Sequence, residues 1–199
     1  MVLLAAACGG GAGADPGEMT GTVLDPPFVV SATPLVDDDG EAYTLTDSTD
    51  KPLTLVFFGY TSCPDICGQV MATLAGTLTR LTDEQKDELD VVLISSDPHR
   101  DTRQVMSDYV RNYDPSIIGL TGDLDDIREV AASVKVAIGY FDLKGRELDS
   151  DDLPPGGYDV EHGTQIFAIN ADDEVDTFWG ADVSQAQLTR DVTILLDEG

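Results

Sequence analysis

One stretch of the chain decides the fold, and it reads Leu53-Thr54-Leu55-Val56-Phe57-Phe58-Gly59-Tyr60-Thr61-Ser62-Cys63-Pro64-Asp65-Ile66-Cys67. Its first six residues form a largely apolar run, which is typical of a strand buried on both faces. A turn follows, and Pro64 suits the first turn of a helix, where a missing N–H is tolerated. We therefore expect a helix from about Pro64 to Arg80, with Cys63 just before it and Cys67 in its first turn.

The rest of the chain alternates strands and helices after an N-terminal hairpin. Residues 28–45 predict an antiparallel hairpin closed by an Asp-Gly turn. Hydrophobic patterns predict strands at residues 90–96, 116–120, 136–143, 164–170 and 175–179, helices at residues 101–112, 123–134 and 184–196, and a polar insertion at residues 144–160. This order favours an α/β fold whose central mixed sheet has a parallel centre, an antiparallel edge and helices on both faces.

Composition indicates one soluble globular domain of strong negative charge. The chain has 199 residues, of which 42% are hydrophobic, so it can bury a core of ordinary size. Its formal net charge is −27, from 38 acidic and 11 basic residues. Nucleic-acid binding is excluded, because phosphate neutralisation requires clustered Lys and Arg. The acidity is typical of a solvated surface; adaptation to high salt and docking of a basic partner remain alternatives.

The N-terminal segment contains a cysteine of its own. The run Met1–Gly11 places small residues before Cys8 and glycines after it, which is similar to the end of a lipoprotein signal. We expect residues 1–26 to be a signal remnant and tether, and residues 27–199 to be the folded domain. Lipidation of Cys8 would hold the domain at the extracytoplasmic face of the cell membrane. The alternative is an unstructured N-terminus with an incidental cysteine.

The pair Cys63 and Cys67 can support two chemistries. Residues four apart at a helix start lie on one face, so their sulfurs can converge, and the helix N-terminus favours thiolate. Thiolates can bind a soft metal or exchange disulfides. The spacing differs from the two-residue separation of thioredoxin-like redox motifs, which favours metal binding. A redox pair and two inert buried cysteines remain open on spacing alone.

Two thiolates would select Cu(I) or Zn, and imidazole is the expected third ligand. The chain has two histidines. His162 directly precedes the strand expected at residues 164–170, which should neighbour the strand leading to the thiol loop, so its loop should lie beside the helix start. His99 lies in the loop Asp97-Pro98-His99-Arg100-Asp101-Thr102, and we interpret it as a surface residue.

Three motifs resemble those of one known family, the Sco/SenC copper-binding proteins. The run from Phe58 to Cys67 resembles the family core F-G-Y-T-x-C-P-D-x-C, and residues 97–102 resemble its D-P-x-R-D-T motif. Glu161-His162 resembles the segment that carries the family's metal-binding histidine. The motifs occur in the family's order, and the resemblance extends over roughly residues 27–196.

The resemblance implies a thioredoxin-like three-layer sandwich that binds a copper ion through Cys63, Cys67 and His162. It also implies a metallochaperone, rather than an enzyme, that supports assembly of the binuclear copper centre on the copper-bearing subunit of cytochrome c oxidase. The alternative is an extracytoplasmic thiol-disulfide reductase with Cys63 and Cys67 as catalytic residues. Gly163 stands where ordinary thioredoxins have a cis-proline, which weakens that alternative. Gly68 and Gly163 depart from the family pattern.

Overall fold

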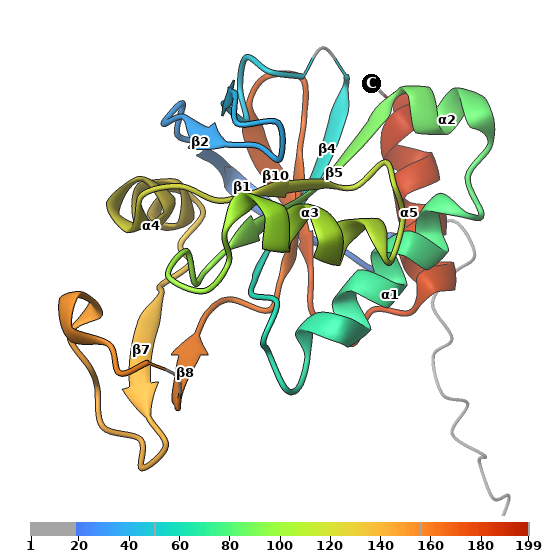
Figure 1. Ribbon diagram of the computed structural model, residues 1–199. Helices are drawn as coiled ribbons and strands as arrows, with labels where there is room; N and C mark the ends of the chain where they lie inside the picture. The colour runs from blue at the N-terminus through green and yellow to red at the C-terminus, as the bar shows by residue number, and fades with distance from the viewer. Residues whose placement is uncertain (1–18, 50, 156, 199) are drawn as a thin grey trace, which may run out of the picture.

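The computed structural model describes residues 19–49, 51–155 and 157–198, so residues 1–18 of the predicted tether at residues 1–26, including Cys8, lie outside the described residues. A six-stranded sheet forms the centre (Figure 1). Its strands, in spatial order, are β1 (Thr22–Val29), β10 (Glu174–Trp179), β9 (Ile166–Ile169), β4 (Leu53–Gly59), β5 (Leu89–Ser95) and β6 (Ile118–Leu120). The β4–β5–β6 part is parallel and the β4–β9–β10–β1 part is antiparallel, which confirms the predicted mixed sheet.

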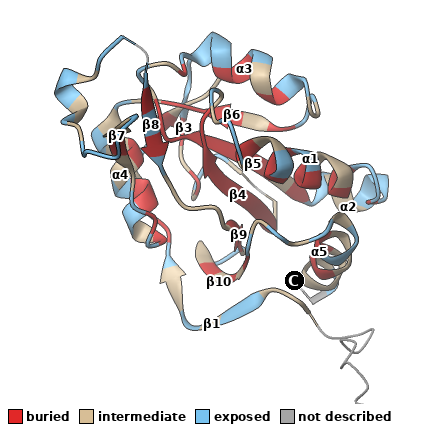
Figure 2. Ribbon diagram, turned by 90° about the horizontal axis from the view of Figure 1, so that it is seen from below, coloured by how far each residue is buried: buried red, intermediate tan, exposed pale blue. Residues whose placement is uncertain are grey.

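Strand β4 separates two apolar layers because successive side chains point to opposite faces. Leu55 and Phe57 pack in one cluster with α1 (Cys67–Leu78), α3 (Arg103–Arg111) and α5 (Gln185–Glu198). Val56 and Phe58 pack in the other, with α4 (Leu124–Ser133). Figure 2 shows β4 and β5 in the buried colour between these helices. Three layers result, and the predicted thioredoxin-like fold class is confirmed.

The N-terminal hairpin forms as a separate two-stranded sheet, and its Val36 exchanges backbone hydrogen bonds with Thr121, the residue after β6. Strands β2 (Leu35–Val36) and β3 (Ala42–Tyr43) pair with each other, and the Asp37 carboxylate accepts the backbone N–H groups of the turn. Our expectation that residues 28–30 belong to this hairpin was wrong, because Phe28 and Val29 lie in β1, which pairs with β10, and Val30 follows directly and donates its N–H to the Asp173 carbonyl. Strand β1 begins at Thr22, before the Pro27 at which we expected folded structure to start.

Two further differences concern short elements. Helix α2 (Asp83–Asp87) was missed, although Thr82 and Gln85 form a capping box at its start. Strand β7 (Gly139–Asp142) does not join the main sheet; it pairs with β8 (Tyr158–Glu161), which lies inside the predicted insertion together with a 3₁₀ turn, Ser150–Asp152. We call β7, β8 and their connection the β7–β8 arm. It projects from the body beside α4 (Figure 1).

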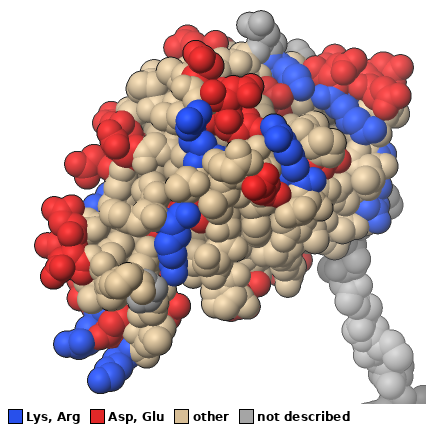
Figure 3. Space-filling view, viewed as in Figure 1, with Lys and Arg blue, Asp and Glu red and all other residues tan. Residues whose placement is uncertain are grey.

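The surface shows two features relevant to localisation. Acidic side chains lie in several separate groups on the face in Figure 3, with basic side chains between them, rather than in one patch. Among the helices of the described residues, none has the length and apolar character required to cross a bilayer.

A buried carboxylate ties the start of the described chain to α5. Asp191 accepts hydrogen bonds from the Thr20 N–H (2.7 Å) and hydroxyl (2.5 Å), the Gly21 N–H (3.1 Å) and the Trp179 indole (2.9 Å). Burial alone would raise the pKa of Asp191, but the hydrogen bonds from Thr20, Trp179 and Arg190 outweigh it, so the pKa is lowered. The ionised form therefore stabilises the attachment of β1.

We expect Asp191→Asn to lower the free energy of unfolding by about 1–3 kcal/mol at pH 7, because an NH2 group that cannot accept replaces one carboxylate oxygen and the remaining oxygen carries no charge. A lowered carboxyl pKa contributes stability above its unfolded value, about 3.9, and this contribution disappears as pH falls through the folded value. The deficit of the variant should therefore be constant from pH 6 to 8 and shrink below about pH 4. Urea unfolding checks this, with Asp172→Asn, an exposed carboxylate, as control; an undiminished deficit in acid would contradict it.

Candidate metal centre

The thiol loop connects the carboxyl end of β4 to α1. Cys67 is the first residue of α1 and is buried, whereas Cys63 lies half-buried in the loop before it, where its N–H donates to the Tyr60 carbonyl over 3.2 Å. The predicted helix start at Pro64 was wrong by three residues, because the segment before Cys67 forms turns and bends. Cys67 lies in the first turn of α1, as expected, whereas Cys63 lies four residues before the helix, in the loop.

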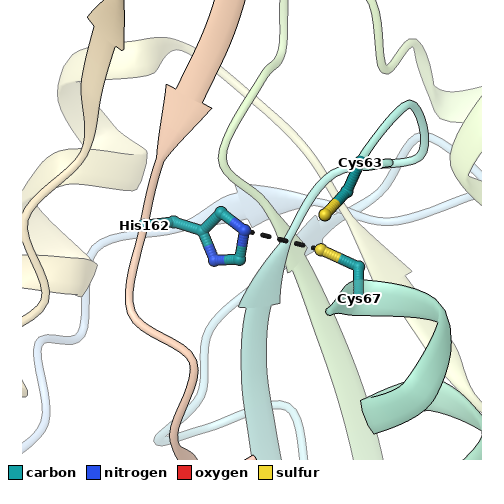
Figure 4. Close-up of side chains that lie close together, drawn as sticks. All are labelled: Cys63, Cys67 and His162. Atoms are coloured by element: carbon teal, nitrogen blue, oxygen red, sulfur yellow. Dashed lines mark hydrogen bonds between the residues drawn. The ribbon is translucent and has the colours of Figure 1, made fainter. Parts of the chain in front are cut away.

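His162 reaches the thiols because of strand pairing in the main sheet. It lies between β8 and β9, and β9 pairs with β4 with Ile166 opposite Phe57. The His162 Nε2 atom lies 3.4 Å from the Cys67 sulfur. The ligand atoms of Cys63, Cys67 and His162 all lie within 4.8 Å of one another. Figure 4 shows the three side chains pointing toward one another. The structure thus brings together the three residues grouped in the sequence; their coordination of a metal stays a prediction.

Hydrogen bonding sets the tautomer of His162. Its Nδ1 lies 2.7 Å from the Gly163 carbonyl, which can only accept, so the proton sits on Nδ1 and the Nε2 lone pair faces Cys67. Burial lowers the pKa of His162, so the ring is neutral near pH 7. A neutral imidazole with a free lone pair is the form that binds metals.

The Cys67 thiol differs from the sequence prediction in one respect. We expected the helix N-terminus to lower its pKa, but burial, followed by the hydrogen bond with Cys63, raises it. In the metal-free protein Cys67 is therefore a neutral thiol, which can donate to Nε2 of His162. The dipole effect is outweighed because α1 starts in the protein interior rather than in solvent.

Aromatic rings form the wall behind the imidazole. The centroids of Tyr60 and Phe57 lie 5.6 and 6.0 Å from that of His162, both edge-on. Both side chains are buried, and burial raises the pKa of Tyr60 to about 12, so its hydroxyl stays protonated. Of the three side chains grouped here, Cys63 and His162 are half-buried and Cys67 is buried, so the site opens to solvent beside Cys63 and His162.

The loop at residues 97–102 supports the site from beneath. Asp101 is fully buried; its carboxylate accepts the Thr61 N–H (3.0 Å), the Thr61 hydroxyl (2.6 Å) and the Ser95 hydroxyl (2.8 Å). It thereby fixes the thiol loop to the end of β5. We did not predict this role; the resemblance to D-P-x-R-D-T was its only signal. His99 is exposed and lies outside the Cys–His group, as expected for a surface residue.

The glycines that depart from the family pattern differ in their surroundings. A Cβ on Gly163 would lie 2.8 Å from a Val136 methyl carbon, so close packing requires glycine there. A Cβ on Gly68 would meet only the Tyr113 hydroxyl, at 3.5 Å, an ordinary contact. The absence of a side chain at Gly163 thus lets the His162 loop approach the body of the protein.

Comparison with known proteins gives concordant results for the sequence. The family model described as SCO1/SenC matches residues 24–197. The mitochondrial SCO1 homolog 1 of Arabidopsis thaliana is 34% identical over 155 residues, which cover 78% of this chain and 43% of the relative. The yeast SCO2 protein is 32% identical over 140 residues, 66% of this chain and 44% of the relative. The chain thus spans less than half the length of these two relatives.

Solved structures match over nearly the whole described fold. Apo Sco1 from Thermus thermophilus has a TM-score of 0.77 at 27% identity, covering 90% of this chain and 98% of that one. Arabidopsis ScoI, solved with copper bound, has a TM-score of 0.73 at 27% identity, covering 86% and 99%. A Bacillus anthracis protein described as a SCO1/SenC family lipoprotein shares the fold, with a TM-score of 0.68 at 20% identity, covering 86% and 98%. The family match over residues 24–197, the fold and the grouped Cys63, Cys67 and His162 together show that this chain belongs to the SCO1/SenC family.

Proposed function

We propose that this protein binds copper through Cys63, Cys67 and His162 and supports assembly of the binuclear copper centre of cytochrome c oxidase. One observation carries the proposal: two sulfurs and the free nitrogen of a neutral imidazole converge within 4.8 Å. Soft thiolates with imidazole favour Cu(I) or Zn among the common cellular ions. The copper bound to a Sco structure with 27% identity supports the same cargo here.

The geometry suits an ion that is carried and released. Because the pKa of Cys67 is raised, copper must displace its proton, so loading is coupled to proton release. A three-ligand site leaves room for an incoming ligand, and Cys63 and His162 are both half-buried, so solvent and a partner reach them before the buried Cys67. A partner's thiolate can therefore enter on the side of Cys63 and His162 and take the ion by stepwise ligand exchange.

The start of the described chain suits delivery at a membrane. Thr22 pairs with Phe178, and Ile166 pairs with both Trp179 and Phe57, so β1 begins at the edge of the sheet that carries the metal site. Three strand spacings, roughly 14 Å, separate β1 from β4. A lipid on Cys8, which we propose as the anchor on the extracytoplasmic face, would then keep this edge near the bilayer and its oxidase subunit.

Titration of the reduced protein with Cu(I), against a chromogenic chelator, tests the proposal. We expect one tightly bound ion per chain and at least about tenfold weaker binding for His162→Ala, since even loosening a ligand typically costs 10–100-fold. The loaded protein should transfer copper to the apo copper domain of the oxidase subunit. The proposal would be contradicted if His162→Ala bound Cu(I) as tightly as the wild type. It would also be contradicted if the loaded protein kept its copper when mixed with the apo copper domain.

A second function, thiol-disulfide reduction, is favoured by the state of the two cysteines. Both are free, and their sulfur atoms lie within 4.8 Å of each other. Attack by one thiolate on a partner disulfide, resolved by the other thiol, would leave a Cys63–Cys67 disulfide and a partner dithiol, with two electrons passed to the partner. The test is to mix copper-free protein with the disulfide form of the oxidase subunit's copper domain. Reduction of that disulfide at least as fast as copper enters the domain would favour this function, and no reduction would exclude it.

A further inference from the structure

The β7–β8 arm carries His162 but is only weakly joined to the rest of the protein by its backbone. Its strands pair with each other and not with the main sheet. His162 follows β8 directly, so any displacement of β8 moves the imidazole relative to Cys63 and Cys67. The groups that hold β8 against the body therefore determine the geometry of the site.

The arm is held by the loop that follows β5. The Tyr140 hydroxyl donates to the Ser96 carbonyl over 3.0 Å, and the Tyr158 hydroxyl donates to the buried Asp97 carboxylate over 2.9 Å. Arg100 joins the same pair: its Nε donates to Asp97 and its Nη1 lies 3.4 Å from the Tyr158 carbonyl. Asp97 thus neutralises the Arg100 guanidinium, and the side chains of Asp97 and Arg100 together hold Tyr158, the first residue of β8.

Arg100 also contacts the thiol loop. Its guanidinium carbon lies 3.9 Å from the Tyr158 ring centroid and 5.5 Å from that of Tyr60, the residue whose ring meets His162 edge-on. The guanidinium therefore bridges the arm that carries the imidazole and the loop that carries the thiols. The Nη2 atom of Arg100 is buried and has no hydrogen-bond partner among the described residues. Hydrogen bonds therefore do not account for this end of the guanidinium, and its contacts with the two tyrosine rings are what favour a planar cation here.

We propose that Arg100 is a positioning residue for the metal site, which holds His162 in register with Cys63 and Cys67 through Tyr158 and Tyr60. This role rests on the proposed copper function, and it assigns Arg100 no contact with the ion. Lysine cannot replace it, because a compact ammonium lacks the planar face that stacks on Tyr158 and the fork that reaches Asp97 and the Tyr158 carbonyl together.

A double-mutant cycle tests this role in the full chain. Arg100→Met and Arg100→Lys should each weaken Cu(I) binding about 10- to 100-fold, the usual cost of losing a group that orients a ligand. In a His162→Ala background the same substitutions should change affinity less than about twofold, because a residue that acts through His162 has nothing left to position. Arg100→Lys keeps the charge beside Asp97, so it remains available if Arg100→Met fails to fold.

A matched control and a metal-free measurement separate this role from general damage. Arg111→Met removes a cation from a surface pair with Asp38 and should leave copper affinity unchanged. NMR of the His162 ring nitrogens without metal should show the single Nδ1–H tautomer in the wild type and a mixture in Arg100→Lys. Equal losses of affinity in both backgrounds, or an unchanged tautomer, would overturn the positioning role. Failure of the wild type to bind copper would instead overturn the proposed function, and the NMR comparison alone would then decide the role of Arg100.

Discussion

Replacing Cys67 with serine is expected to abolish tight copper binding, with Cu(I) affinity at least about 100-fold lower, beyond the range caused by loosening a ligand. Serine keeps the size of the side chain at this buried position, but its hydroxyl is a hard donor that does not lose its proton near neutral pH. The site would retain one thiolate and one imidazole. Competition with a chromogenic Cu(I) chelator measures the loss.

Cys8→Ser is the matched control for that experiment, because it makes the same exchange at a cysteine outside the described residues. It should leave copper affinity unchanged. It should also release the protein from the membrane fraction if Cys8 carries a lipid, which mass spectrometry of that fraction can verify. A Cys67→Ser variant that binds copper as tightly as the wild type would contradict the assignment of Cys67 as a ligand.

Replacing Asp101 with alanine is expected to lower the free energy of unfolding by about 2–3 kcal/mol and to weaken copper binding about tenfold. Burial raises the pKa of Asp101 despite hydrogen bonds from Thr61 and Ser95, so its charge is not the source of stability. The loss comes from the Thr61 N–H and the hydroxyls of Thr61 and Ser95, which are left without their acceptor. Urea unfolding and the copper titration measure the two effects.

Asp108→Ala is the control for this prediction, since Asp108 is exposed on α3 and its carboxylate accepts a hydrogen bond from Gln104 in the same helix. We expect a change of less than about 0.5 kcal/mol, as is usual for surface substitutions. If Asp101→Ala were as stable as this control, the carboxylate would not fix the thiol loop to β5. If it were less stable but bound copper normally, the loop would not depend on that attachment.

Local patterns were sufficient for the centre of the fold and insufficient for its edges. The apolar run of β4 predicts a strand buried on both faces, and all seven residues of that strand are buried. The segment at residues 28–30 is equally compatible with a hairpin or a sheet edge, because its partner, β10, lies near the other end of the chain. Strand β8 shows alternating burial over four residues, a signal too short to detect within a polar insertion.

The site was predictable to the extent that its residues are close in sequence. Cys63 and Cys67 converge because a short loop of turns and bends connects them at the start of α1, whereas His162 required knowledge of which strands are neighbours. The raised pKa of Cys67 was not predictable, since it depends on burial by distant residues. The roles of Arg100 and Asp101 were missed for the same reason: their partners, Tyr158 and Thr61, lie on other elements.

X-ray absorption spectroscopy of the Cu(I)-loaded protein tests the central claim most directly, because it counts the sulfur and nitrogen ligands of the ion. We expect two sulfurs and one imidazole nitrogen in the wild type, and two sulfurs without that nitrogen in His162→Ala. A copper ion with a single sulfur ligand, or one whose nitrogen ligand persists after His162 is removed, would contradict binding by Cys63, Cys67 and His162.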